Sequence, residues 1–171
     1  MDDQLPVFVT ARKDLLVGVN WQSADSAGEM QFVAPLAIGG RTIRGLWLRG
    51  SCYETYPHEA VMFQLEVSRD GVRTRTPLSR IDWRPLQQPH KNGPHKDPLH
   101  SRTVVWGSHI HGFAANWVAE KGVMRAGNLP YALEIAPDPR GYDDLIDFVA
   151  KQFRINGLDK IERPLWMQRL L

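Results

Sequence analysis

Residues 61–68 read Val-Met-Phe-Gln-Leu-Glu-Val-Ser, and this stretch decides the fold class. Successive side chains of a β-strand point to opposite faces, so a spacing of two between apolar residues predicts a strand with one face toward a core. The apolar positions are Val61, Phe63, Leu65 and Val67, and the polar positions are Gln64, Glu66 and Ser68. The sequence therefore predicts a half-buried strand over 61–68.

Further strands are expected on both sides of this segment. The apolar run 32–38 and the segment 41–49 flank Gly39-Gly40. Two glycines favour a hairpin, because both central residues of a tight primed turn need positive φ. The other segments with a strand pattern are 78–84, 103–106 with an extension to 111, and 131–136. Together these segments predict five or six short strands in a mainly antiparallel sheet.

A helix is expected near the C-terminus. Leu145, Ile146, Val149 and Phe153 recur at the spacing that places apolar side chains on one helix face. Asn156-Gly157 is a plausible stop signal. A second helix is expected near 113–121. The sequence thus predicts an α+β fold with the C-terminal helix packed on the sheet.

The length of 171 residues indicates a single domain over 1–171. A hydrophobic fraction of 43% with 23% charged residues excludes a disordered or fibrous chain. We expect a polar loop at 22–30 and a loop rich in Pro, Gly and His at 87–101. The tail 158–171 is apolar enough to dock on the domain or on a protein partner.

The N-terminal residues lack the basic-then-apolar layout of a secretory signal. No apolar run reaches the length of a membrane span, about 20 residues. These features predict a cytoplasmic protein that does not enter the membrane. The single cysteine, Cys52, excludes an internal disulfide framework and a cysteine-rich zinc site. A nucleophilic pair of Cys52 with His58 is one interpretation, and a buried structural thiol is the favoured one.

The charge balance argues against a strong electrostatic nucleic-acid binder. Lys and Arg number 21 against 19 Asp and Glu, which gives a net charge of +2. Arginines interleaved with aromatic residues could still bind RNA, although solvated strand faces are the favoured interpretation. The arginines are Arg41, Arg44, Arg49, Arg69, Arg73, Arg75, Arg80 and Arg84, and the aromatic residues are Trp47, Tyr53, Tyr56 and Trp83.

Five of the six histidines fall within 22 consecutive positions: His90, His95, His100, His109 and His111. On a strand, His109 and His111 share one face with their Cα atoms about 7 Å apart. Two imidazoles placed in this way can bind one metal ion or can bracket one phosphate group.

Three functions fit this cluster. In metal-free cleavage of a phosphodiester, in RNA or a nucleotide, His109 and His111 act as acid and base. His90 is then a third participant, and Asp82 and Asn92 orient the rings. In a metal-dependent hydrolase, His109 and His111 hold a divalent metal ion. The third ligand would come from His90, His95, His100, Asp82, Asp97 or Glu120. In a binding module, the same pocket or the tail 158–171 holds a partner without chemistry.

Three motifs resemble a known pattern: Asp82, then Pro89-His90-Lys91-Asn92, then Gly107-Ser108-His109-Ile110-His111. They resemble an uncharacterised family of small bacterial and phage proteins with the pattern Asp…Pro-His-x-Asn…Gly-x-His-x-His. The resemblance covers roughly residues 32–166. It implies that Asp82, His90, Asn92, His109 and His111 belong to one site, and it carries no established activity. For the phosphodiester-cleaving enzyme, a role as a toxin or in conflict between phage and host is expected.

Overall fold

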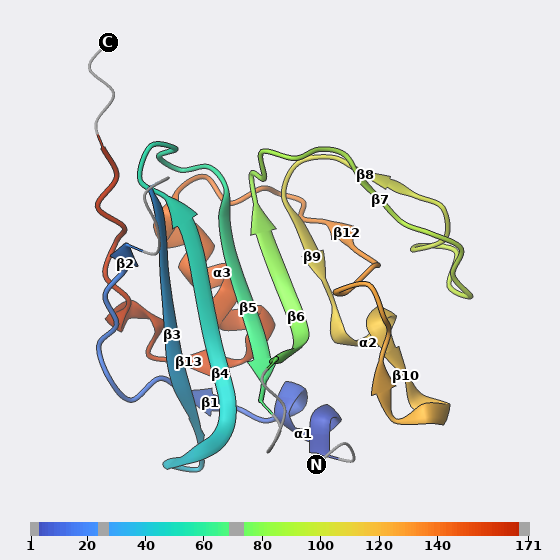
Figure 1. The fold of residues 1–171 in the computed structure, drawn as a ribbon, viewed down its shortest axis with the longest axis horizontal. Helices are drawn as coiled ribbons and strands as arrows, with labels where there is room; N and C mark the ends of the chain where they lie inside the picture. The colour runs from blue at the N-terminus through green and yellow to red at the C-terminus, as the bar shows by residue number, and fades with distance from the viewer. Residues whose placement is uncertain (1–3, 24–27, 69–73, 168–171) are drawn as a thin grey trace.

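The computed structural model describes residues 4–23, 28–68 and 74–167 (Figure 1). The helical elements are α1 (Leu5–Thr10), α2 (Phe113–Asn116), η2 (Ala119–Lys121), α3 (Tyr142–Phe153) and η3 (Leu158–Lys160). The longer strands are β3 (Glu29–Ile38), β4 (Arg41–Tyr53), β5 (Val61–Val67), β6 (Thr76–Trp83) and β9 (His109–His111). The short strands are β1 (Lys13–Asp14), β2 (Gln22–Ser23), β7 (His90–Lys91), β8 (Val104–Val105), β10 (Trp117–Val118), β11 (Val123–Met124), β12 (Leu133–Glu134) and β13 (Ile155–Asn156).

One large sheet organises the described part of the chain. Its strand order is β12-β9-β6-β5-β4-β3-β1-β13, with β2 added on β3. Only the pairing of β1 with β13 is parallel among the named strands of this sheet. The predicted α+β class with a mainly antiparallel sheet is therefore confirmed. The predicted strand number was wrong, because this sheet has nine strands. Four of them are two residues long, too short for an alternating pattern to reveal.

The predicted hairpin around Gly39-Gly40 joins β3 to β4. The φ angles of these glycines are 59° and 74°, in the region that favours glycine. Gly50 on β4 serves a different purpose, because it lies directly opposite Phe32 on β3. A Cβ atom at position 50 would lie 2.2 Å from the Phe32 ring. The absence of a side chain at position 50 lets the Phe32 ring pack closely against β4.

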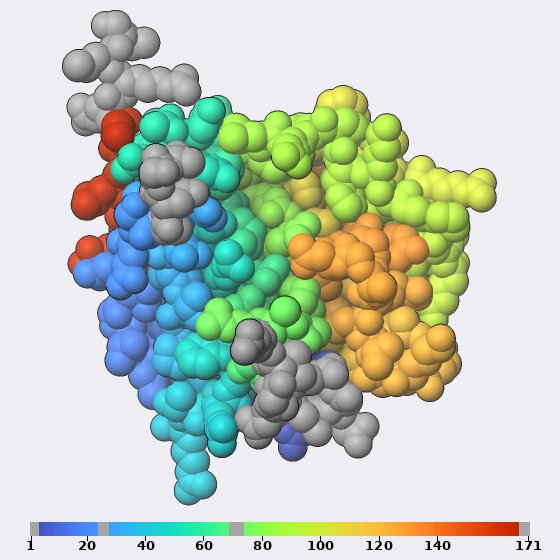
Figure 2. Space-filling view, viewed as in Figure 1, coloured from blue at the N-terminus to red at the C-terminus, as the bar shows by residue number. Residues whose placement is uncertain are grey.

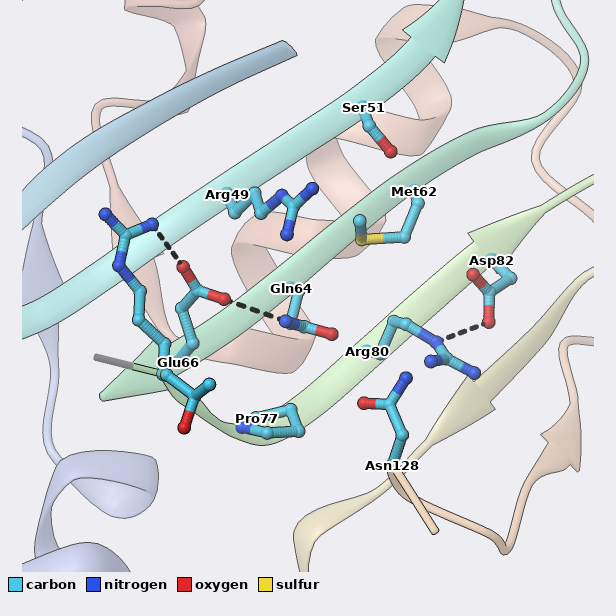
Figure 3. A pocket seen from close by; sticks show the side chains of 11 residues that line it. Arg49, Ser51, Met62, Gln64, Glu66, Pro77, Arg80, Asp82 and Asn128 are labelled. Atoms are coloured by element: carbon cyan, nitrogen blue, oxygen red, sulfur yellow. Dashed lines mark hydrogen bonds and ion pairs between the residues drawn. The ribbon is translucent and has the colours of Figure 1, made fainter. Parts of the chain in front are cut away.

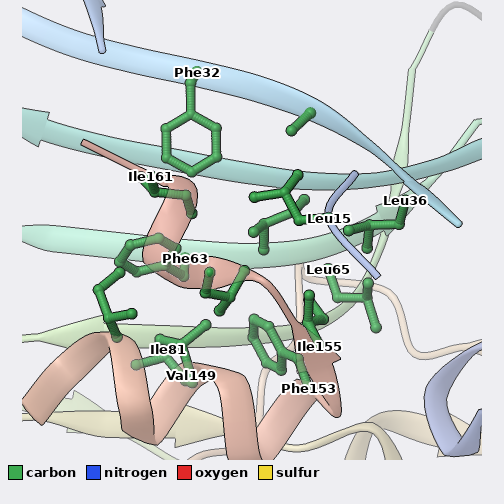
Figure 4. Close-up of a cluster of buried hydrophobic side chains, with 14 of the residues drawn as sticks. Leu15, Phe32, Leu36, Phe63, Leu65, Ile81, Val149, Phe153, Ile155 and Ile161 are labelled. Carbon is green, nitrogen blue, oxygen red and sulfur yellow. The ribbon is translucent and has the colours of Figure 1, made fainter. Parts of the chain in front are cut away.

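One face of the sheet is apolar and is covered by α3 (Figures 1 and 4). The predicted inward residues of β5 and β6, including Phe63, Leu65 and Ile81, are fully buried. They pack in one cluster with Leu145, Val149 and Phe153 of α3. This packing confirms the predicted C-terminal helix. The helix ends at Phe153 with Arg154 as its C-cap, before the expected stop, because Ile155 and Asn156 pair with β1 as strand β13.

Several segments differ from the expectation. A polar loop was expected at 22–30, but Gln22–Ser23 pairs with β3, and β3 begins at Glu29. Residues 24–27 lie outside the described part of the chain, and most of the remaining residues of this segment are in strands. The segment 103–111 forms two strands instead of one. β8 pairs with β7 inside the 87–101 region, whereas β9 joins the large sheet. The expected helix near 113–121 consists of α2, β10 and η2. Hydrogen bonding to neighbouring segments, which no local pattern encodes, determines these elements.

The described part of the C-terminal tail docks on the domain. Leu158, Ile161 and Pro164 are buried, and the Trp166 ring lies 4.6 Å from the His58 ring. Leu165, by contrast, is 87% exposed. Residues 168–171 lie outside the described part. Within the described ranges, every helix is too short or too polar to cross a membrane.

Candidate functional site

The polar face of the sheet gathers the charged residues of β6 and the histidines of β9. β9 pairs antiparallel with β6, which places Asp82 opposite His109 and Arg80 opposite His111. Residues two apart on a strand share a face, so all four side chains project to the same side. Arg80 and Asp82 are thus two residues apart on β6, just as His109 and His111 are two residues apart on β9.

Asp82 is the hub of these contacts. Its Oδ2 atom lies 3.4 Å from Nε2 of His109, 3.1 Å from Nε2 of His111 and 2.8 Å from Nε of Arg80. Burial alone would raise the pKa of Asp82. The contacts with His109 and His111 and the charge of the Arg80 guanidinium outweigh burial, and they hold this pKa far below its usual value. Asp82 is therefore ionised at neutral pH.

His90 reaches the same centre from the short strand β7. Its ring centroid lies 4.8 Å from that of His111 and 5.4 Å from that of His109. One nitrogen of each of the three rings lies within 4.8 Å of a nitrogen of the other two. Among the described residues this is the one group of three or more His, Cys, Asp or Glu arranged to hold a metal ion.

Backbone carbonyls fix the orientation of all three rings. Nδ1 of His109 lies 2.8 Å from the Gly107 carbonyl oxygen, and Nδ1 of His111 lies 2.6 Å from that of Leu129. Nε2 of His90 lies 3.1 Å from the Pro130 carbonyl oxygen. A carbonyl only accepts, so each of these nitrogens carries the proton. The lone pair of each neutral ring is thus on the other nitrogen.

His111 is neutral in this arrangement. Burial lowers the pKa of His111 and outweighs the opposing effect of Asp82. With Nδ1 donating to Leu129, Nε2 of the neutral ring accepts a hydrogen bond from Nη2 of Arg80 at 2.8 Å. The Arg80 guanidinium thus holds the position that a cation would take beside His111.

Two buried asparagines hold the segment that supplies the Leu129 and Pro130 carbonyls. Asn92 donates to the Ala132 carbonyl at 2.8 Å and accepts from its N–H at 2.9 Å. Asn116 pairs in the same way with Tyr131, at 2.9 and 3.0 Å. Asn92 Oδ1 also lies 3.1 Å from Nε2 of His90. Asn92 therefore positions His90 and its carbonyl partner together.

Two cavities meet at Arg80 and Asp82 on this face. His90 and His109 line a cavity of about 520 Å³. The neighbouring cavity, about 670 Å³, extends over β4 and β5 past Gln64 and Arg49 (Figure 3). Figure 2 shows the same face, with the orange segment around residue 130 beside the green strands. Asp82 is thus accessible to a ligand, whereas His111 is 0% exposed.

The structure brings together Asp82, His90, Asn92, His109 and His111, and it separates His95 and His100 from them. Nε2 of His95 donates to the Ala115 carbonyl at 3.2 Å, and its Nδ1 accepts from the Asp97 N–H at 3.0 Å. His100 pairs with Asp97 at 3.1 Å. Among the described residues, His90 is therefore the candidate ligand that joins His109 and His111, and Asp82 lies next to them.

The sequence reasoning missed the roles of Arg80 and Asn116. Arg80 belongs to the arginines expected on solvated strand faces, although its spacing of two from Asp82 indicates the same face of the strand. Asn116 carries no local signal, because its partner Tyr131 is 15 residues away. Cys52 is buried, and burial raises the pKa of its thiol to about 12, which disfavours a thiolate nucleophile.

Comparisons with known proteins do not assign the chain to a family. No protein-family model matches the chain. No curated protein and no solved structure matches it either. The resemblance to small bacterial and phage proteins therefore stays a prediction from the sequence, and the function has to be argued from the geometry of the site.

Proposed function

We propose that this protein is a metal-dependent hydrolase in which His90, His109 and His111 hold a divalent metal ion, with zinc as the best fit. The observation that carries the proposal is the anchoring of all three rings on backbone carbonyls. Histidines that ligate metals are held in this way, with one nitrogen donating to a fixed acceptor and the other facing the ion. Three protein ligands also leave one zinc position open for water or substrate.

The site meets the chemical requirements of such an ion. Metal ligation needs neutral imidazoles, and the burial that lowers the pKa of His111 favours that form. The ionised Asp82 adds a negative charge beside the three rings. The three imidazole nitrogens that lie within 4.8 Å of one another are the groups that would hold such an ion. An ion on Nε2 of His111 would take the place of the Arg80 guanidinium, whose Nη2 lies 2.8 Å from that atom.

The surrounding residues supply the rest of a hydrolytic mechanism. A divalent metal with an open position lowers the pKa of its water to about 7. Asp82, whose Oδ2 lies 3.4 Å from Nε2 of His109 and 3.1 Å from Nε2 of His111, would take up the proton of a water held by such an ion. A new P–O bond forms, the bond to the leaving alkoxide breaks, and the alkoxide takes a proton from solvent. Arg80 stabilises the negative charge that develops on the phosphoryl oxygens.

A metal inventory with a hydrolysis assay tests this proposal. Purified untagged protein is analysed by plasma mass spectrometry, and hydrolysis of bis(p-nitrophenyl) phosphate is measured with and without EDTA. We expect one metal ion per chain, lost in the double variant His109→Ala/His111→Ala and retained in the control His95→Ala/His100→Ala. Wild-type protein that contains no metal, and binds none when zinc is added, would overturn the proposal.

A second candidate, metal-free cleavage of a phosphodiester in RNA or a nucleotide, is favoured by one observation. The His90 and His109 rings stack at 5.4 Å beside the Arg80 guanidinium, which lies 2.8 Å from His111. Two imidazoles and a cation are the groups that acid–base cleavage needs. RNA cleavage that persists fully in EDTA and is lost in both His90→Ala and His109→Ala would establish this candidate in place of the first.

A further inference from the structure

The cavity of about 670 Å³ beside the histidine centre contains an arginine that the proposed chemistry does not use. Arg49 on β4 and Gln64 on β5 line this cavity with Arg80 of β6 (Figure 3). The sheet register pairs Arg49 with Gln64, Gln64 with Arg80, and Arg80 with His111. These four residues therefore form one row across the polar face. At about 4.8 Å per strand, Arg49 is about 10 Å from Arg80 along this row.

The other charges of the cavity are neutralised within the protein. Arg75 forms an ion pair with Glu66 at 2.7 Å, and Arg80 forms one with Asp82 at 2.8 Å. Within the ranges that the structure describes, Arg49 has no carboxylate partner. Its Nε atom is buried without a hydrogen-bond partner. The cavity thus has a net positive charge that comes from Arg49.

A buried donor without a partner is costly, because it has lost water and gained no acceptor. A guanidinium presents a planar fork of N–H donors that matches the oxygens of a phosphate group. A phosphate bound at the Arg49 guanidinium would balance the charge of the cavity. The volume is also within the range of about 300–1,000 Å³ that small-molecule ligands occupy.

We infer that this cavity binds an organic phosphate of about nucleotide size, with Arg49 as the residue that receives a phosphate group. The cavity opens toward Arg80, Asp82 and the histidine centre. The inference therefore rests on the proposed function, which places the reacting end of the substrate at that centre. Arg49 is then a specificity residue that selects phosphorylated substrates. Arg49 anchors these substrates at the opposite end of the row from His111.

Isothermal titration calorimetry with AMP tests the inference on the full chain, both as purified and after EDTA treatment. Adenosine is the matched ligand without phosphate. The variants are Arg49→Gln and Arg49→Lys. Arg41→Gln is the control, since Arg41 is an exposed residue of the same strand and its substitution removes the same charge outside the cavity.

We expect wild-type protein and Arg41→Gln to bind AMP with similar Kd and not to bind adenosine. Arg49→Gln should weaken AMP binding at least about tenfold, as expected for loss of a charged hydrogen-bond donor. Arg49→Lys should be intermediate, because lysine retains the charge and loses the fork. Circular dichroism confirms that each variant is folded.

Two results would overturn the inference: equal AMP affinity in Arg49→Gln and Arg41→Gln, or no binding of AMP to wild-type protein up to about 10 mM. The EDTA-treated sample separates this outcome from failure of the proposed function. AMP binding that depends on Arg49 in protein without metal supports the phosphate site even if the metal centre is disproved. Metal content that is unchanged in Arg49→Gln shows that the variant affects the phosphate site alone.

Discussion

Two groups of histidines lie close together in the sequence and differ completely in their surroundings. His90, His109 and His111 each give one nitrogen to a backbone carbonyl, and Nε2 of His109 and of His111 lies beside Asp82. His95 uses both nitrogens on its own loop and on α2, and His100 pairs with the half-exposed Asp97. The first group brings three ring nitrogens within 4.8 Å of one another, whereas the second group organises a loop.

The difference arises from the scaffold beneath each group. His109 and His111 are on a strand of the large sheet, and His90 is fixed by Asn92 to the segment that carries Pro130. A functional site needs side chains held to within fractions of an ångström, and rigid elements provide this better than loops do. Clustering of histidines in sequence is therefore a weaker indicator of a site than shared anchoring.

The largest effect is expected from His111→Ala, compared with His95→Ala. Loss of His111 removes one of three proposed ligands and the acceptor for Arg80. Metal binding should be abolished, and hydrolysis of bis(p-nitrophenyl) phosphate should fall by at least about 10³-fold. His95→Ala should keep the metal and most of the activity. Equal losses in both variants, by metal analysis and initial rates, would break the comparison between the two groups.

The next largest effect is expected from Asp82→Asn. This variant keeps the shape of the side chain and removes the carboxylate that takes the proton. The rate should fall by about 10²–10⁴-fold, the range for loss of a general base. Metal stoichiometry should stay at one per chain. Asp97→Asn is the matched control in the second group, and a fall of similar size there would contradict the assignment of Asp82.

Asn92→Ala should have its main effect on stability. It leaves the N–H and carbonyl of Ala132 without their buried partner and releases His90. We expect a loss of about 2–3 kcal/mol in the free energy of unfolding, measured in urea, because buried polar groups would be unsatisfied. The exposed Asn20→Ala is the control. If the two variants have the same stability, Asn92 does not anchor the segment that supplies the carbonyls.

Arg80→Met tests the metal assignment through an expected increase in zinc affinity. The guanidinium contacts His111 Nε2 at 2.8 Å and competes with a metal ion for that nitrogen. Zinc affinity, measured by competition with a chelating dye, should rise by up to about tenfold, while the hydrolytic rate falls through loss of charge stabilisation. Reduced zinc affinity would show instead that Arg80 supports the centre.

The smallest effect is expected from His100→Gln. Its partner Asp97 is 42% exposed at the side chain, and such pairs add little to stability. The melting temperature, metal content and AMP affinity should all match those of wild-type protein. A measurable loss of metal would place His100 in the site and remove the distinction between the two groups.

Much of the fold could be predicted because its signals are local. The alternation over 61–68, the glycine pair at 39–40 and the apolar stripe of α3 each depend on residues within one element. The two-residue strands could not be predicted, because backbone pairing with a distant neighbour creates them. β13 exists only because Ile155 and Asn156 meet β1, more than 140 residues away in the chain.

The sequence by itself determined the α+β class, the shared face of His109 and His111, and the surplus of histidines in one region. Local periodicity and composition are enough for these. Only the tertiary structure decided which histidines converge, because the carbonyls of Leu129 and Pro130 that orient them lie 18 and 40 residues away. It alone also aligned Arg49, Arg80 and His111 in one row. The reason is physical: register between strands depends on hydrogen bonding across the whole sheet, and no single strand encodes it.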